Sequence, residues 1–154
     1  MTTHVKEAHA YSQDLDQWVD RQRAAVSLLS SIGNLMYNHS IELVLFRNEL
    51  VDCSVSEILN LHEYGRKTVN KPIDVFTSSE LAKIIENLQL APSKIDIGRL
   101  SNEWLNEQGD FKTKADFISN KLSNIIDDSK FQLEPKDVVL FGFGRIGRLL
   151  TREI

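Results

Sequence analysis

Three glycines near the C-terminal end of the chain have the spacing that a dinucleotide-binding turn requires. Gly142, Gly144 and Gly147 form a G-x-G-x-x-G pattern after an apolar run at 138–141 and before a helix-forming series. In such a strand–turn–helix unit the first glycine permits the turn, the second lets phosphates approach, and the third lets the helix pack on the strand. Free N–H groups and the positive helix-dipole end face the anion. The pattern predicts a pyrophosphate-binding turn.

The residues around these glycines are more specific than the glycines themselves. Residues 141–148 read Phe-Gly-Phe-Gly-Arg-Ile-Gly-Arg. This run resembles the opening βα turn of glyceraldehyde-3-phosphate dehydrogenase, which reads Asn-Gly-Phe-Gly-Arg-Ile-Gly-Arg. The resemblance extends from Asp137 to Arg152, and Phe141 replaces the family's usual asparagine.

The resemblance implies a cofactor site without a catalytic centre. In that family a cysteine thiolate, activated by a histidine, attacks a small phosphorylated aldehyde, and NAD or NADP takes the hydride. Neither catalytic residue maps onto this sequence, so we expect the front part of a longer enzyme, inactive and without bound cofactor when alone. No catalytic or metal-ligating residue is assigned. By resemblance, the cofactor-binding residues are Gly142, Phe143, Gly144, Arg145, Ile146 and Gly147.

Composition indicates a soluble protein of ordinary character. The 154 residues are 42% hydrophobic and 26% charged, which suits one domain or one domain plus part of another. A net charge of −4 argues against a nucleic-acid partner. The single cysteine fits a reducing compartment, and neither a signal segment nor a membrane-spanning run is present. We therefore predict a cytoplasmic protein with no membrane partner.

The pattern of apolar residues predicts a mostly α fold. We expect about five helices with a small β-hairpin near 41–52, followed by the truncated first strand–turn–helix of an α/β Rossmann domain. The corresponding divisions are a mobile arm at 1–11, a helical domain at 12–128, a linker at 129–136, and the start of an NAD(P)-binding domain at 137–154.

The first predicted helix is long and amphipathic. From Ser12 onward, apolar residues recur three or four positions apart between Leu15 and Met36, which predicts one helix ending near Asn38 or Ser40. Trp18 on this helix, like Trp104 further on, has aliphatic neighbours at helical spacing. We expect both tryptophans to lie in the core rather than to form a stacking platform.

Capping signals place the remaining elements. Ser54 with Glu57, and Thr77 with Glu80, have the spacing of capping boxes. The run 41–46 predicts the first hairpin strand, with Asn48 left-handed in the turn, although a helical continuation through 41–51 is the competing interpretation. Further helix starts are expected at Asp96 and Thr113, and helix ends at Gly65 or 70–72, at 91–93, at Gly109 and near 127–128.

The polar candidates elsewhere are weak. Cys53, His39 and His62 do not have the spacing of a structural zinc site, which needs four converging ligands. Cys53 is also a poor nucleophile, because the neighbouring Asp52 raises its thiol pKa. A small, half-buried apolar role is the better interpretation of Cys53.

Two classes of function remain open from the sequence. In the first, the chain begins an oxidoreductase, forms a homo-oligomer, and uses its helical part for stability or assembly. In the second, the helical part is a protein-interaction or regulatory module, tethered to this or to a different dinucleotide-binding reductase. Because the glycine pattern contains the residues Arg-Ile-Gly-Arg, a different reductase is the least favoured of these alternatives.

Overall fold

The computed structural model confirms a mostly helical chain with a small β part, and the predicted hairpin belongs to a three-stranded sheet. It describes residues 2–71, 73–126, 139, 141–142 and 144–152, and side chains within these ranges except those of 2–10, 66 and 150. Within this part none of the helices is long and apolar enough to cross a membrane. The elements are α1 Thr2–His39, β1 Ile41–Leu45, β2 Asn48–Glu49, α2 Val55–Val69, α3 Val75–Glu86, β3 Ser93–Asp96, α4 Ile97–Glu107, α5 Lys114–Lys121 and α6 Arg145–Leu150.

The sheet has the strand order β2-β1-β3, with β1 in the centre. The predicted hairpin is confirmed: β1 pairs antiparallel with β2, with Val44 opposite Glu49. The competing helical continuation is therefore excluded. The left-handed residues of the turn are Phe46 and Arg47, at φ 47° and 72°, so our assignment of Asn48 to that conformation was wrong. Asn48 instead stabilises the turn by donating its side-chain amide to the Leu45 carbonyl at 2.9 Å.

The third strand was not predicted. β3 runs parallel to β1, with Ile41 opposite Ser93 and Val44 opposite Asp96. Its sequence, Ser-Lys-Ile-Asp, has one buried apolar residue, Ile95, and follows a proline, so it gave no strand signal of its own. A short parallel strand forms only where a neighbouring strand offers N–H and C=O groups for pairing. Here that neighbour is β1, which lies about fifty residues earlier in the chain.

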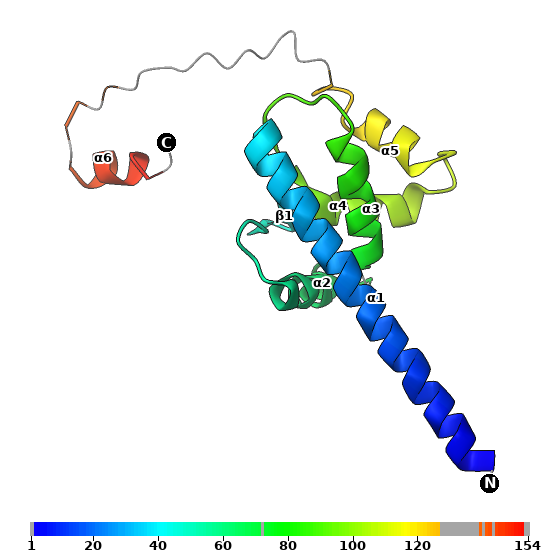
Figure 1. Ribbon diagram of the computed structural model, residues 1–154. Helices are drawn as coiled ribbons and strands as arrows, with labels where there is room; N and C mark the ends of the chain where they lie inside the picture. Colours follow the sequence, from blue (N-terminus) through cyan, green and yellow to red (C-terminus); the bar gives the residue numbers. More distant parts are fainter. Residues whose placement is uncertain (1, 72, 127–138, 140, 143, 153–154) are drawn as a thin grey trace.

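Helix α1 is longer than predicted. It begins at Thr2, whereas we expected regular structure only from Ser12. Once a helix exists, each added residue gains a hydrogen bond without a new nucleation cost, so residues with no apolar rhythm can extend it. Figure 1 shows the inner half of α1 lying across the body and the outer half projecting from it. The division of the chain into domains stays a prediction.

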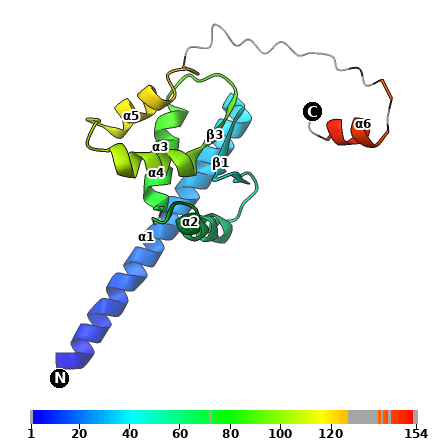
Figure 2. The ribbon, with the colours of Figure 1, turned by 180° about the vertical axis from the view of Figure 1, so that it is seen from behind.

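The core lies between α1 and the later helices. β1 is buried at four of its five positions and packs against α1 and α4, as the opposite views in Figures 1 and 2 show. Helix α3 lies along α1, and α5 packs against α3. The largest fully buried side chains, which fix this arrangement, are Phe117, Leu28, Leu35, Ile41, Leu43, Leu45, Leu50, Ile58, Leu81, Ile85, Ile97 and Ile118.

Of the four helix starts predicted from capping residues, three are confirmed. Ser54 and Glu57 form the complete capping box, in which the Ser54 N–H donates to the Glu57 carboxylate at 2.7 Å. Asp96 and Thr113 cap α4 and α5 through their side-chain oxygens. The box predicted at Thr77 is wrong, because α3 already begins at Val75.

The α3 start is capped by Asp74, whose carboxylate accepts from the Phe76 N–H at 3.3 Å. The serines that suggested a cap at Thr77 are instead buried in the first turns of α3. Ser78 and Ser79 are 0% and 5% exposed. Their hydroxyl groups therefore serve the packing of α3 and not its end.

Helix ends depended on contacts between elements. Helix α2 passes through Gly65 and ends at Val69, followed by its C-cap Asn70, which is left-handed with φ 55°. A glycine is needed inside the helix, since a Cβ at Gly65 would lie 2.9 Å from the Phe46 ring. Helix α4 ends at Glu107, just before the predicted Gly109.

The last body helix is shorter than predicted. Helix α5 ends at Lys121 and not near 127–128, and Ile126 forms an antiparallel bridge with Leu90. The Ala91 N–H also donates to the Ile125 carbonyl at 3.0 Å. Backbone pairing with this distant segment therefore replaces the last helical turn. The predicted linker at 129–136 lies outside the described residues.

Candidate functional site

The glycine turn has a backbone conformation that residues other than glycine rarely adopt. Gly142 has φ +93°, in the left-handed region where a Cβ is strained. Two residues later the chain enters helix α6, which begins at Arg145 with Gly144 as its N-cap. A turn that leads directly into a helix N-terminus is the local geometry that the glycine spacing predicts.

The third glycine is required by close packing. A Cβ at Gly147 would lie 2.5 Å from the carbonyl oxygen of Gly142, so any larger residue would push α6 off the turn. Gly144 differs, because no described atom lies within 4 Å of the position of its Cβ. The chain itself therefore explains the glycines at 142 and 147. The space at Gly144 faces outward, as expected where a ligand rather than the protein approaches the backbone.

The surroundings of the turn are positively charged and open. No side chain caps the first turn of α6. Arg145 and Ile146 are exposed, the latter to 73%. Arg145, Arg148, Leu149 and Arg152 line a shallow hollow of about 360 Å³. The three guanidinium groups extend over about two helical turns, from the first residue of α6 to Arg152 just after its end, and this positive charge favours an anion such as phosphate.

The strand predicted before the turn is not formed at the positions the structure describes. Val139 and Phe141 belong to no strand and are both exposed. A single strand cannot satisfy its backbone groups without a neighbour to pair with, which gives the physical reason. Residues 138 and 140 lie outside the described residues, as does Phe143 of the predicted cofactor set.

A buried polar cluster links α2, α3 and α4. His62 is 3% exposed, and its Nδ1 lies 2.7 Å from the Ile58 carbonyl, so Nδ1 carries the proton. Its Nε2 lies 3.0 Å from the Ser78 hydroxyl, which is 3.1 Å from that of Ser101. Burial lowers the pKa of His62, although the hydrogen bond to Ile58 opposes this. All three side chains are buried, so the cluster serves packing and offers no reactive group to a substrate.

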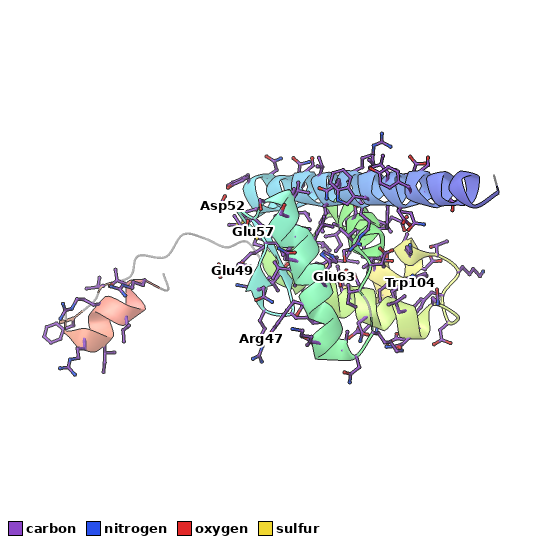
Figure 3. All side chains as sticks on the ribbon, turned by 90° about the horizontal axis from the view of Figure 1, so that it is seen from below. Arg47, Glu49, Asp52, Glu57, Glu63 and Trp104 are labelled. Carbon is purple, nitrogen blue, oxygen red and sulfur yellow. The ribbon has the colours of Figure 1, made fainter. Side chains whose placement is uncertain are left out.

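Cys53 has the unreactive character expected from its neighbours. Burial raises the pKa of its thiol, and the carboxylates of Glu57 and Asp52 raise it further. Figure 3 shows these acids with Glu49 on the same side of the body. Among the described residues, no group of three or more histidine, cysteine or acidic side chains could hold a metal ion.

The hairpin and α2 line an open hollow that the sequence did not predict. It has a volume of about 540 Å³ and depends on the packing of the hairpin against α2. Its lining residues are Asn48, Glu49, Cys53, Glu57, Asn60, Leu61 and Tyr64.

The two tryptophans have different surroundings. Trp104 packs edge-on against Phe117, with ring centroids 5.4 Å apart, as expected for a core residue. Trp18 is 58% exposed, so its predicted core position was wrong. The buried side of α1 is formed by other positions, among them Leu28 and Leu35.

Comparison with known proteins gives one informative match. The chain matches no protein-family model. It is 28% identical over 128 residues to a "glyceraldehyde-3-phosphate dehydrogenase-like protein" of Pseudomonas aeruginosa (strain UCBPP-PA14). The match covers 81% of this chain but 28% of that protein, so the chain spans less than a third of its relative. Over most of its length, this chain is thus distantly similar to a protein named as dehydrogenase-like.

Proposed function

We propose that the chain is the N-terminal part of an NAD- or NADP-dependent oxidoreductase similar to glyceraldehyde-3-phosphate dehydrogenase. The geometry of the glycine turn carries the proposal. The positive φ of Gly142 and the contact between Gly147 and the Gly142 carbonyl each require glycine, at two of the three positions in the pattern. The distant similarity to a dehydrogenase-like protein supports the same family.

In this proposal the chain's own role is to bind and orient the cofactor. The backbone N–H groups of Arg145 and Ile146 would donate to the pyrophosphate, and the space at Gly144 would let it approach. The nearby arginines add positive charge. The bound nicotinamide cofactor supplies a hydride acceptor, while the substrate, a small phosphorylated aldehyde, would be held by other parts of the enzyme.

The first test uses the protein made from the whole reading frame that contains these residues. We expect an acidic residue about twenty positions after the glycines, where it would bind the adenosine ribose. We also expect NAD- or NADP-dependent oxidation of glyceraldehyde 3-phosphate, measured as absorbance of the reduced cofactor. A frame without these residues, or a purified protein without this activity, would contradict the proposal.

A point substitution tests the turn itself in that protein. Gly144→Val fills the space before α6, and should weaken cofactor binding about tenfold or more, that is by about 1.4 kcal/mol. Gly109→Val is the matched control, because Gly109 also has no atom within 4 Å of its Cβ position. Isothermal titration with NAD and with NADP measures both variants. Equal affinities in the two would show that the turn does not hold the cofactor.

The helical part contributes to assembly or regulation in this proposal. Removing residues 1–126 from the same protein separates the two roles. Unchanged kinetic constants with a changed oligomeric mass would indicate assembly, whereas a changed response to effectors at constant mass would indicate regulation. Loss of cofactor binding itself would assign the helices to the enzyme's own fold and contradict both roles.

A further inference from the structure

Helix α1 carries a row of apolar side chains that the fold leaves uncovered. Tyr11, Leu15, Trp18 and Val26 are 72%, 47%, 58% and 55% exposed. With half-buried Gln22 between them, they follow one another at steps of three or four residues, so they share one face of the helix. Single exposed apolar residues are ordinary, but a continuous row with two aromatic residues is typical of an interaction surface.

Where α1 joins the body, the packed side of the helix borders this row, because Ala25, seven residues after Trp18, is fully buried. Ala24, Leu28 and Leu35 are buried in the core. At about 100° per residue, these three positions lie about 140° around the helix axis from the row. Tyr11, Leu15 and Trp18 all precede Ala24, the first core residue of α1. The outer half of α1 projects from the body (Figure 1).

Charged residues beside the row are arranged for an antiparallel copy of the same helix. Asp14 and Asp16 lie toward the outer end, and Arg21 and Arg23 lie further in. By the helical period, Asp14 and Arg21 flank one side of the row, and Asp16 and Arg23 lie beyond the other. Two antiparallel copies bring each aspartate toward an arginine on the same flank of the other copy. Two parallel copies would oppose aspartate with aspartate.

The same register pairs the apolar residues. When Asp14 and Asp16 lie opposite Arg21 and Arg23 of the second copy, Tyr11 lies opposite its Val26, and the two Trp18 side chains meet near the two-fold axis. Exposed Val26 is thus available to its proposed neighbour. Aromatic residues at the centre of an interface commonly contribute most of its affinity.

The arginines can take part without losing their present contacts. Arg21 donates to Glu63 at 3.0 Å and Arg23 to Asp20 at 3.3 Å, and all four side chains are largely exposed. A guanidinium has five N–H donors and can bind two carboxylates at once. We infer that the α1 row, Tyr11 to Val26, is a self-association surface through which two copies of this chain pair antiparallel about a two-fold axis.

The first test measures the mass of the 154-residue chain by analytical ultracentrifugation over about 1–100 µM, the affinity range of modest interfaces. We expect a monomer–dimer equilibrium. Leu15→Gln with Trp18→Gln should raise the dissociation constant at least about tenfold. Tyr64→Gln is the matched control, because Tyr64 is a 56% exposed aromatic on α2, away from the row.

Thermal unfolding separates association from folding. Leu15 and Trp18 are exposed within one copy, so at a concentration where the wild type is monomeric the double variant should unfold at the same temperature. A wild-type chain that stays monomeric over the whole range would overturn the inference. So would a double variant that dimerises as tightly as the wild type.

A charge exchange tests the antiparallel register. Asp14→Arg with Asp16→Arg should weaken self-association, since it opposes arginine with arginine, and this variant retains the Arg21–Glu63 pair. Arg21→Asp with Arg23→Asp should also weaken it. Mixing the two variants restores opposite charges at every position, so the mixture should form heterodimers. No loss in the first variant would exclude the register, as would a mixture that remains monomeric although both components are folded.

These tests are independent of the cofactor proposal, because the measured quantity is the mass of a chain that needs no cofactor. The chain could dimerise even if the turn at Gly142 bound nothing.

Discussion

The buried His62 couples stability to pH. Its imidazole contacts the Ile58 carbonyl and the Ser78 hydroxyl in a site that favours the neutral ring. Asp74 raises and Arg21 lowers the pKa of His62 to smaller extents than burial does. In the unfolded chain the ring has its ordinary pKa of about 6.5. Below that pH the unfolded state therefore binds a proton that the folded state does not.

The sign of the pH effect follows from this difference. His62's contribution to stability is fully present above about pH 6.5, and it is lost as the pH falls toward and through the lower pKa of the folded chain. We expect urea unfolding to show a smaller free energy at about pH 5 than at about pH 7.5. In His62→Gln this difference should shrink. An identical pH dependence in the variant and the wild type would refute the assignment to His62.

Gly98 is required by packing rather than by its own backbone. A Cβ there would lie 3.0 Å from Leu45 Cδ1 and 3.0 Å from the Phe46 ring. Leu45 is fully buried and cannot withdraw. We expect Gly98→Ala to lower the free energy of unfolding by about 1–3 kcal/mol, in spite of alanine's better helix propensity.

Gly33 provides the matched control for Gly98. It lies inside α1, and no atom is within 4 Å of the position of its Cβ. Gly33→Ala should therefore stabilise the chain by about 0.5–1 kcal/mol. Chemical denaturation of both variants measures the difference. If Gly98→Ala were stabilising as well, the contact of α4 with Phe46 would be looser than the structure has it.

At the scale of elements, the start of α2 depends on a local capping box. Ser54 and Glu57 exchange hydrogen bonds between side chain and backbone, and these bonds hold the Glu57 pKa below its usual value. Ser54→Ala should lower the free energy of unfolding by about 1 kcal/mol. Thr77→Ala is the control, since Thr77 has the same sequence pattern but lies inside α3. Its effect should stay within about 0.5 kcal/mol.

The sheet shows why some elements need their neighbours. Strand β2 has two residues and β3 has four, and each pairs only with β1. Neither segment could hold an extended conformation alone, because a short strand without partners leaves its backbone groups unpaired. The Asp96 carboxylate joins the two sides by accepting from the Phe46 and Arg99 N–H groups, both at 3.0 Å. One side chain therefore binds the hairpin turn and caps the start of α4.

At the scale of the whole molecule, the hydrophobic core that the described residues form lies in the body. Among these residues, every member of the core cluster, and every partly buried residue packed on it, lies between Ala24 and Ile126. We expect a chain of residues 11–126 to unfold with the same midpoint as residues 1–154, measured by circular dichroism at a concentration where both are monomeric. A lower midpoint for the shorter chain would mean that residues 1–10 or the residues after 126 contribute to the stability of the body.

The sequence by itself determined the features that depend on a few adjacent residues. The capping box at Ser54, the caps at Asp96 and Thr113, and the hairpin after Ile41 are all local, and each was predicted at the right place. The positive φ of Gly142 also agrees with its place in the glycine pattern. Such features are fixed by the backbone preferences and hydrogen bonds of neighbouring groups, which the sequence shows directly.

Only the tertiary structure decided which surfaces are covered. Trp18 and Leu28 both lie on α1 at helical spacing, yet Leu28 is buried and Trp18 is exposed, because the described core cluster begins at Ala24 and Trp18 precedes it. Strand β3, the passage of α2 through Gly65 and the early end of α5 likewise depend on segments far away in sequence. The free energy of burial belongs to pairs of surfaces, and a pattern within one segment cannot specify its partner.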